Sequence, residues 1–207
     1  RFSNNFSENF SVIKNTYSAL NPNYYGNFSI STNMLKTSFS RRDKNFSNSF
    51  EKMKNNRLIV AQRLISQKNL NNINLDSEGF PIGFSKNSQE VLINSFLSAY
   101  LGKNPNDISL NPISKSPKLN WSLQYDGLSK LFENFISRLS IGHGYRSSFT
   151  INNFRSNLNY SPNSFDNSGN YMSEKLYSNI NLVEQFNPLI EVDIEFKNSL
   201  RLILDVI

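Results

Sequence analysis

The run IEVDIEF at residues 190–196 decides the fold class of this chain. Its apolar residues occupy every second position, and Glu191, Asp193 and Glu195 occupy the positions between them. Because successive side chains of a strand point to opposite faces, this pattern predicts a strand with one apolar and one acidic face. The acids are expected to form a solvated wall, and a carboxylate cluster for acid–base chemistry or a cation is the less favoured interpretation.

The same alternation continues on both sides of this run. Upstream, residues 176–186 alternate as far as a predicted turn at Asn187-Pro188, and downstream the pattern runs from Ser199 to Val206, with Lys197-Asn198 either a tight turn or a continuation. An upstream strand of about 11 residues, tilted near 40°, would span roughly 27 Å. That length is close to the roughly 25 Å apolar band of an outer-membrane barrel, whereas strands of soluble sandwiches are usually about 5–6 residues long.

Three further segments alternate in the same way. Residues 27–40 are a strand candidate, and Trp121, Leu123 and Tyr125 mark a short strand. Residues 139–160 alternate throughout but change phase near Asn152-Asn153, which predicts a β-bulge or a turn there. Residues 163–170 are predicted to be an exposed loop.

Two segments have helical rather than strand periodicity. Residues 44–67 are predicted to form a basic amphipathic helix capped by Asp43. Residues 88–101 are predicted to form a second helix, with Asn87 and Glu90 as a capping box and Gly102 at its end. The basic helix would either lie on anionic headgroups or lipopolysaccharide, or pack as a loop helix with a wet outer face, which is the favoured reading.

Composition limits the classes of protein to which the chain can belong. Of its 207 residues only 38% are hydrophobic, yet it contains 17 Phe and 9 Tyr, which argues against disorder. The lack of cysteine excludes disulfides, thiolate metal sites and a cysteine nucleophile. Apolar runs stay far below the roughly 20 residues of a spanning helix, which excludes a helical membrane protein but not a transmembrane β-barrel.

The net charge of +6 comes from the first part of the chain. Residues 1–75 contain 11 Lys and Arg against 3 acids, whereas residues 76–207 contain 11 against 13. A nucleic-acid partner is disfavoured because no recognised docking motif accompanies the basic residues. Asn-Phe-Ser triplets at Asn5, Asn9, Asn27 and Asn45 are assigned no function.

Candidate chemical groups are few. His143 lies between two glycines and is a candidate general base. No sequence motif supplies the nucleophile or second histidine that would accompany it, so a structural role is favoured. The segment 76–79 (Asp-Ser-Glu-Gly) faintly resembles a calcium loop but lacks the other ligands, and is interpreted as a turn. No catalytic, cofactor-binding or metal residue is predicted, and the chain is not expected to be an enzyme.

The elements divide the chain into three parts. Residues 1–42 are expected to be an N-terminal segment with one strand, residues 43–112 a helical insertion that acts as a cap or plug-like loop, and residues 113–207 a set of antiparallel wall strands. Both ends are expected to be cuts in a longer protein. Six or seven strands are too few to close a membrane barrel, so they would belong to a larger sheet.

Several blocks together resemble the SprA (Sov) family of cell-surface and gliding-motility proteins of Bacteroidetes. The similarity covers most of residues 28–207 in the same order. The blocks are Asn56–Leu64, Gly79–Ile93, Phe96–Tyr100, Asn120–Leu128, Gly142–Ser147 and Glu184–Ile190.

This resemblance implies a fragment of the outer-membrane translocon of the type IX secretion system. The implied fold is mainly β, with antiparallel strands that form part of a very large β-barrel and carry helical loop insertions. The implied partners are secreted cargo proteins, companion outer-membrane proteins, a periplasmic plug protein and outer-membrane lipid, and the implied location is the outer membrane and cell surface. The motifs assign no functional residue.

Two alternatives remain at the level of sequence. A TonB-dependent transporter would need a plug domain and a TonB box upstream of Arg1. A soluble surface adhesin or glycan-binding β-domain would have strands of about 5–6 residues and would fractionate without detergent.

Overall fold

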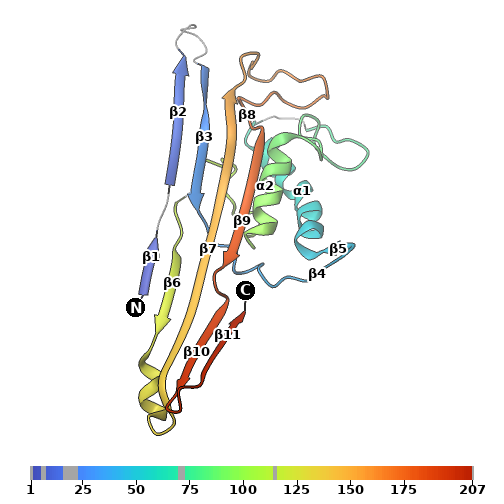
Figure 1. Cartoon of the computed structure of the whole chain (residues 1–207). Coiled ribbons are helices and arrows are strands. Elements are labelled where there is room, and N and C mark those ends of the chain that lie inside the picture. The colour runs from blue at the N-terminus through green and yellow to red at the C-terminus, as the bar shows by residue number, and fades with distance from the viewer. Residues whose placement is uncertain (1, 6–7, 16–22, 70–72, 114–115, 207) are drawn as a thin grey trace.

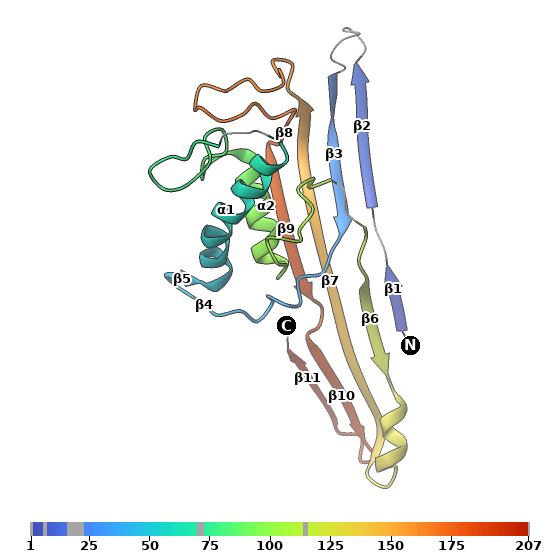
Figure 2. The ribbon, with the colours of Figure 1, turned by 180° about the vertical axis from the view of Figure 1, so that it is seen from behind.

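The computed structural model describes residues 2–5, 8–15, 23–69, 73–113 and 116–206. All but two short strands of the described chain belong to one antiparallel sheet, which has a small helical unit on one side (Figures 1 and 2). The sheet contains β1 (Phe2–Asn5), β2 (Glu8–Asn15), β3 (Asn23–Ser31), β6 (Asn120–Tyr125), β7 (Ile136–Ser156), β8 (Lys175–Leu176), β9 (Asn179–Phe186), β10 (Ile190–Phe196) and β11 (Arg201–Val206). The other elements are the β4–β5 hairpin (Arg42–Asp43 and Phe46–Ser47), α1 (Asn48–Ser66), α2 (Gln89–Tyr100) and the 3₁₀ helix η1 (Gly127–Phe132).

Strand β7 is the axis of the molecule. It has 21 residues, about four times the length of an average strand. Its C-terminal half pairs with β3 on one side and β9 on the other, and its N-terminal half pairs with β6 and β10. The mainly antiparallel β-fold expected from the alternation is therefore observed, and the nine strands belong to one open sheet rather than a closed barrel.

The phase change inside β7 is a β-bulge. Asn153 has a left-handed backbone conformation (φ 51°), and the register of β3 shifts between Gly26 and Phe28. The side-chain amide oxygen of Asn27 accepts a hydrogen bond from the Asn153 backbone N–H at 2.9 Å. The bulge keeps Phe154 on the same buried face as Ile151, which confirms the predicted slip within one continuous strand.

The helical unit covers one face of the upper part of the sheet. Strand residues Phe28 and Phe149 meet edge to face, with ring centroids 6.2 Å apart, beneath Leu97 of α2. The full core cluster is Phe28, Ile30, Met34, Leu97, Leu101, Ile108, Phe149, Ile151 and Phe154. A second cluster joins α1 and α2 through Val60, Ala61, Leu64, Ile65, Phe80, Phe84 and Val91.

Several predicted boundaries are wrong. The strand expected over residues 27–40 ends at Ser31, because the chain then leaves the sheet and Met34 N–H donates to the Tyr145 hydroxyl at 2.8 Å. The helix expected over residues 44–67 begins only at Asn48. Its N-cap is Ser47 rather than Asp43, which lies in the hairpin.

Other boundaries differ less. The N-cap of α2 is Ser88 rather than Asn87, whereas Gly102 follows the helix with φ 60° as expected. The predicted 11-residue strand over residues 176–186 is divided into β8 and β9. Two strands that the alternation did not indicate, β1 and β2, lie at the opposite edge of the sheet.

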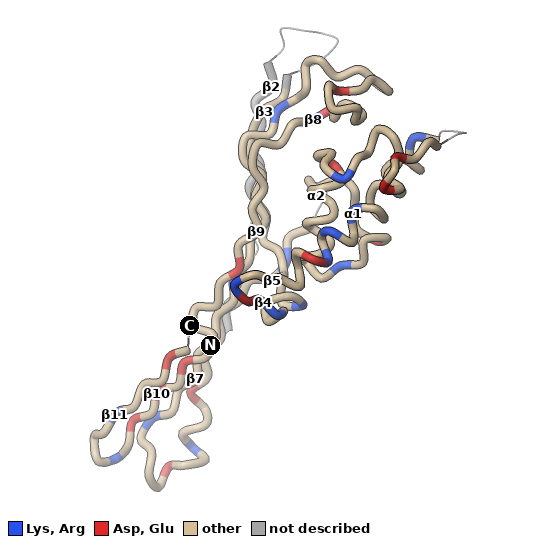
Figure 3. The backbone as a smooth tube through the Cα atoms, turned by 90° about the vertical axis from the view of Figure 1, so that its right-hand side faces the viewer, with Lys and Arg blue, Asp and Glu red and all other residues tan. Residues whose placement is uncertain are grey.

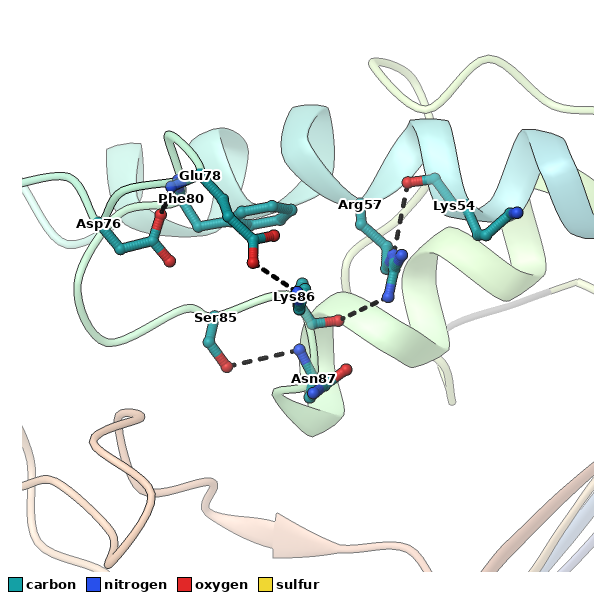
Figure 4. A network of polar contacts seen from close by, with 8 residues as sticks. All are labelled: Lys54, Arg57, Asp76, Glu78, Phe80, Ser85, Lys86 and Asn87. Carbon is teal, nitrogen blue, oxygen red and sulfur yellow. Dashed lines mark hydrogen bonds and ion pairs between the residues drawn. The ribbon is translucent and has the colours of Figure 1, made fainter.

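The loop at residues 76–79 is a structural turn. The carboxylate of Asp76 accepts hydrogen bonds at 2.8 Å from the backbone N–H groups of Glu78 and Phe80 (Figure 4). Glu78 in turn pairs with Lys86, whose carbonyl oxygen accepts a hydrogen bond from Arg57 of α1 (Figure 4). Because the Asp76 carboxylate accepts hydrogen bonds from the backbone of its own loop, the interpretation of residues 76–79 as a turn is confirmed.

The start of α2 is fastened to the sheet edge by Gln89. Its amide nitrogen donates to the Lys175 carbonyl at 2.8 Å, and its amide oxygen accepts from the Tyr177 N–H at 3.0 Å. We expect Gln89→Ala to lower hydrogen-exchange protection of residues 175–179 by about 1–3 kcal/mol, because two hydrogen bonds are lost. Gln62→Ala, at an exposed position of α1, is the control. Equal protection of residues 175–179 in both variants would contradict the role of Gln89 in attaching α2 to the sheet edge.

Candidate functional site: a two-faced lower sheet

The candidate site is the part of the sheet that extends beyond the helical unit. We call β6, β7 from Ile136 to Tyr145, β10 and β11 the lower sheet. Figures 1 and 3 show it projecting away from α1 and α2, so that neither of these two helices covers it. Its register places every side chain on one of two faces.

One face, which we call the apolar face, is continuous across the four strands. Cross-strand rows join Leu139 to Ile194 to Leu202, and Ile141 to Val192 to Leu204. Tyr125 of β6 extends the second row on the other side of Ile141. The outermost residues are largely exposed, at 51% for Tyr125, 43% for Leu202 and 53% for Leu204. Exposed apolar side chains in neighbouring cross-strand rows are typical of a surface that contacts a partner or a membrane.

The opposite face is polar and carries the three acids predicted from the sequence. Glu195 lies between Arg138 of β7 and Arg201 of β11 in one row. Asp193 and Arg201 form a bidentate ion pair, with both N–O distances 2.9 Å. The three carboxylates share a face as expected, but flanking arginines balance two of them, and Ile203 is an apolar exception on this face. Glu191 and Glu195 are exposed as expected, but Asp193 is only 7% exposed, so the expectation of a solvated acidic wall is correct for two of the three acids.

Aromatic side chains limit the apolar face at its upper end. Trp121 stacks on Tyr145 at 4.6 Å between ring centroids, and Phe186 lies 5.3 Å from Tyr145. His143 lies 6.1 Å from both Trp121 and Phe186, and Phe39 stacks on Phe186 at 5.6 Å. These five residues, the aromatic row, cross three strands at one level.

Aromatic residues also gather at the lower end. Phe132, the last residue of η1, is 50% exposed, and Phe135, just before β7, is 74% exposed. A strand from Ile136 to Tyr145, tilted near 40° as barrel strands are, would cover roughly 23 Å. That height matches the roughly 25 Å band flanked by aromatic girdles in outer-membrane barrels.

His143 has a structural environment. Its Nδ1 lies 2.6 Å from the Leu189 carbonyl oxygen, and its ring belongs to the aromatic row. Its neighbour Tyr145 donates to Glu184 at 2.8 Å, and Ser38 donates to the same carboxylate oxygen at 2.7 Å. These bonds hold the segment after β3 against the top of the lower sheet. Neither the aromatic row nor this link could be read from local sequence pattern.

Tyr177 gives the upper part of the molecule a dependence on alkaline pH. Burial raises the pKa of Tyr177 to about 12, and Glu90 and Glu174 add to the effect. The folded state therefore keeps this proton between pH 10 and 12 while the unfolded chain loses it, so stability falls as pH rises through that range. We expect Tyr177→Phe to unfold with a shallower alkaline loss in a pH series, and an unchanged slope would contradict this origin.

Comparisons leave the chain without an assigned family. A scan against protein-family models found no match, and a search of curated proteins found none either. Neither helix in the described part of the chain has the length and hydropathy that crossing a membrane requires. Among the described residues, no group of three His, Asp or Glu side chains is placed to hold a metal ion.

Proposed function

We propose that the chain is an arc of wall from the outer-membrane translocon of the type IX secretion system. In this proposal the lower sheet crosses the bilayer, with its apolar face toward lipid and its charged face toward a wide aqueous lumen. The lumen conducts folded cargo proteins to the cell surface and supports gliding motility, without catalysis. Companion outer-membrane proteins and a periplasmic plug protein control access.

The observation that carries the proposal is the exposed apolar face opposite a charged face. The lengths of β6, β10 and β11, at 6, 7 and 6 residues, would fit a soluble sheet equally well. A soluble sheet, however, buries its apolar face against another layer. Here neither α1 nor α2 packs on the apolar face (Figure 3), its outer residues are exposed, and aromatic residues border it above and below, as on the lipid-facing surfaces of outer-membrane barrels.

The open edges of the sheet fit a larger wall. Among the described strands, β11 pairs only with β10, and β1 pairs only with β6. In a bilayer an unpaired strand edge leaves peptide groups without hydrogen-bond partners, and each such group costs roughly several kcal/mol of free energy. The proposal therefore requires further strands on both sides, and the resemblance to the SprA (Sov) family supplies a barrel of that size.

The experiment compares a gliding bacterium that carries this gene with its deletion strain. The protein is expected in the outer-membrane fraction, resistant to salt and carbonate but released by detergent, and deletion is expected to abolish cargo at the surface. Release by salt alone would favour a soluble adhesin. Outer-membrane localisation with intact secretion but lost nutrient uptake would favour a TonB-dependent transporter, and either result overturns the proposal.

A further inference from the structure

A basic and aromatic segment lies exposed at the lower end of the helical unit. We call residues 36–54 the basic foot; it comprises the end of the loop after β3, the β4–β5 hairpin and the first turns of α1. It contains six Lys and Arg against two acids. All six basic residues are exposed: Lys36, Arg41, Arg42, Lys44, Lys52 and Lys54.

Three phenylalanines share this exposed segment with the basic residues. Phe39 is 74% exposed, Phe46 39% and Phe50 48%. Arg41 lies over the Phe46 ring and Lys54 over the Phe50 ring, each 5.4 Å from the ring centroid. Exposed aromatic and basic side chains together are typical of surfaces that meet the headgroup region of a membrane.

The basic foot begins at the aromatic row. Phe39 stacks on Phe186, and Ser38 donates to Glu184, so the foot leaves the sheet at the upper limit of the apolar face. Phe186 is paired with Tyr145 and shares its face with Phe149, on which the helical unit packs. Figure 3 shows the β4–β5 hairpin on that side of the sheet, with basic residues along it. The foot therefore overhangs the apolar face.

Most of the positive charge of the foot is unpaired. Arg41 pairs with Asp43, and Lys54 with Glu51. Within the described residues Lys36, Arg42, Lys44 and Lys52 form no ion pair, and each is exposed. Four free cations above an apolar face are complementary to phosphate groups above a layer of acyl chains.

Helix α1 itself does not lie in a membrane. Its apolar residues Val60, Ala61, Leu64 and Ile65 are buried against the rest of the helical unit. Only its first turns remain free to meet another surface. This excludes the reading of residues 44–67 as a helix lying along headgroups and confines the contact to the foot.

We propose that the basic foot binds the phosphate groups of the membrane whose acyl chains cover the apolar face. The proposal rests on the proposed function, because it requires the lower sheet to cross that membrane. The partner is an anionic headgroup layer, and the contact fixes the height of the helical unit above the bilayer. Nucleic acid is the less favoured partner, since it gives no reason for the apolar face directly below.

Single-cysteine labelling tests the contact, because this chain contains no cysteine. The full chain would carry an environment-sensitive fluorophore at Phe46→Cys, Ile194→Cys or, as the aqueous control, Ser168→Cys. Each form is reconstituted in vesicles of phosphatidylcholine alone or with phosphatidylglycerol. Quenchers on the headgroup and in the middle of the acyl chain then report the depth of each label.

The label at position 46 is expected to be quenched from the headgroup, and more strongly with phosphatidylglycerol. Arg42→Gln with Lys44→Gln should weaken this contact at least about fivefold, given the attraction of each cation to an anionic surface. Arg155→Gln with Lys118→Gln, which removes two exposed cations outside the foot, should leave it unchanged. An equal effect of both pairs overturns the proposal, because it would show only a general charge effect.

The labels also separate this proposal from the proposed function. Acyl-chain quenching at position 194 without headgroup quenching at position 46 overturns the proposed contact of the basic foot, but it still supports the proposal that the lower sheet crosses the membrane. Absence of quenching at both positions overturns both. A third outcome would assign the foot to nucleic acid instead. In it, position 46 shows no headgroup quenching, and the protein binds a labelled oligonucleotide in a salt-sensitive way that Arg42→Gln with Lys44→Gln abolishes.

Discussion

Replacing Ile194 with lysine is expected, under the proposed function, to block assembly of the protein in the outer membrane. Ile194 lies in the middle of the apolar face, between Leu139 of β7 and Leu202 of β11. A lysine on the lipid-facing side of a barrel near the bilayer midplane costs about 2–4 kcal/mol. The measurement is the fraction of protein that resists carbonate extraction from the membrane, together with its urea midpoint in detergent.

Glu191→Lys is the matched control for this prediction. It introduces the same side chain on the same strand, but on the charged face and opposite Asp205. Asp193 would be a poor control because its carboxylate is held by Arg201, and its loss would leave a partner unpaired. Equal tolerance of lysine at positions 191 and 194 would contradict the assignment of the faces.

Replacing Gly144 with alanine is expected to destabilise the junction between the upper and lower parts of the sheet. A Cβ atom at this position would come close enough to overlap the Asn187 carbonyl oxygen. Gly144 also exchanges two backbone hydrogen bonds with this segment, to Pro188 at 2.9 Å and from Asn187 at 3.0 Å. Overpacking and the loss of both bonds together predict a cost of about 3–5 kcal/mol in the free energy of unfolding.

Gly142→Ala provides the comparison within the same strand and face. Its Cβ would lie 3.0 Å from a carboxylate oxygen and 3.3 Å from the Cβ of Glu191, so a shift of a few tenths of an ångström in this exposed side chain relieves the contact. Urea unfolding of the two variants in the same detergent measures the difference. A loss of stability at Gly142→Ala as large as that at Gly144→Ala would show that strand flexibility, rather than the Asn187 contact, is responsible.

Alternation in the sequence was enough to predict the faces of the lower sheet. Ile190, Val192 and Ile194 share the apolar face, and the acids between them share the other, because side-chain direction in a strand is a local property. The bulge at Asn153 was also visible as a change of phase. The wall part of the candidate site was therefore predictable in outline.

What could not be predicted depends on contacts between distant segments. The alternation of residues 27–40 continued past Ser31, but Met34 leaves the sheet to meet Tyr145, 111 residues away. Nothing in the sequence indicates that Arg201 pairs with Asp193 and not with Glu195, the residue opposite it in the register. The Asn-Phe-Ser triplet at residues 9–11, which was assigned no function, lies in β2. The strands β1 and β2 were not predicted, because short polar strands have little periodicity of their own.

The single strand β7 makes the molecule mechanically continuous. Its upper part lies under the helical unit and its lower part is the centre of the lower sheet, within one uninterrupted strand. A force on the helical unit, directed along β7, would load its hydrogen bonds to β3, β9, β6 and β10 in shear. These bonds lie perpendicular to the strand, so many of them would have to break at once. A force applied to the helical unit would therefore be transmitted directly to the lower sheet, without a hinge between them.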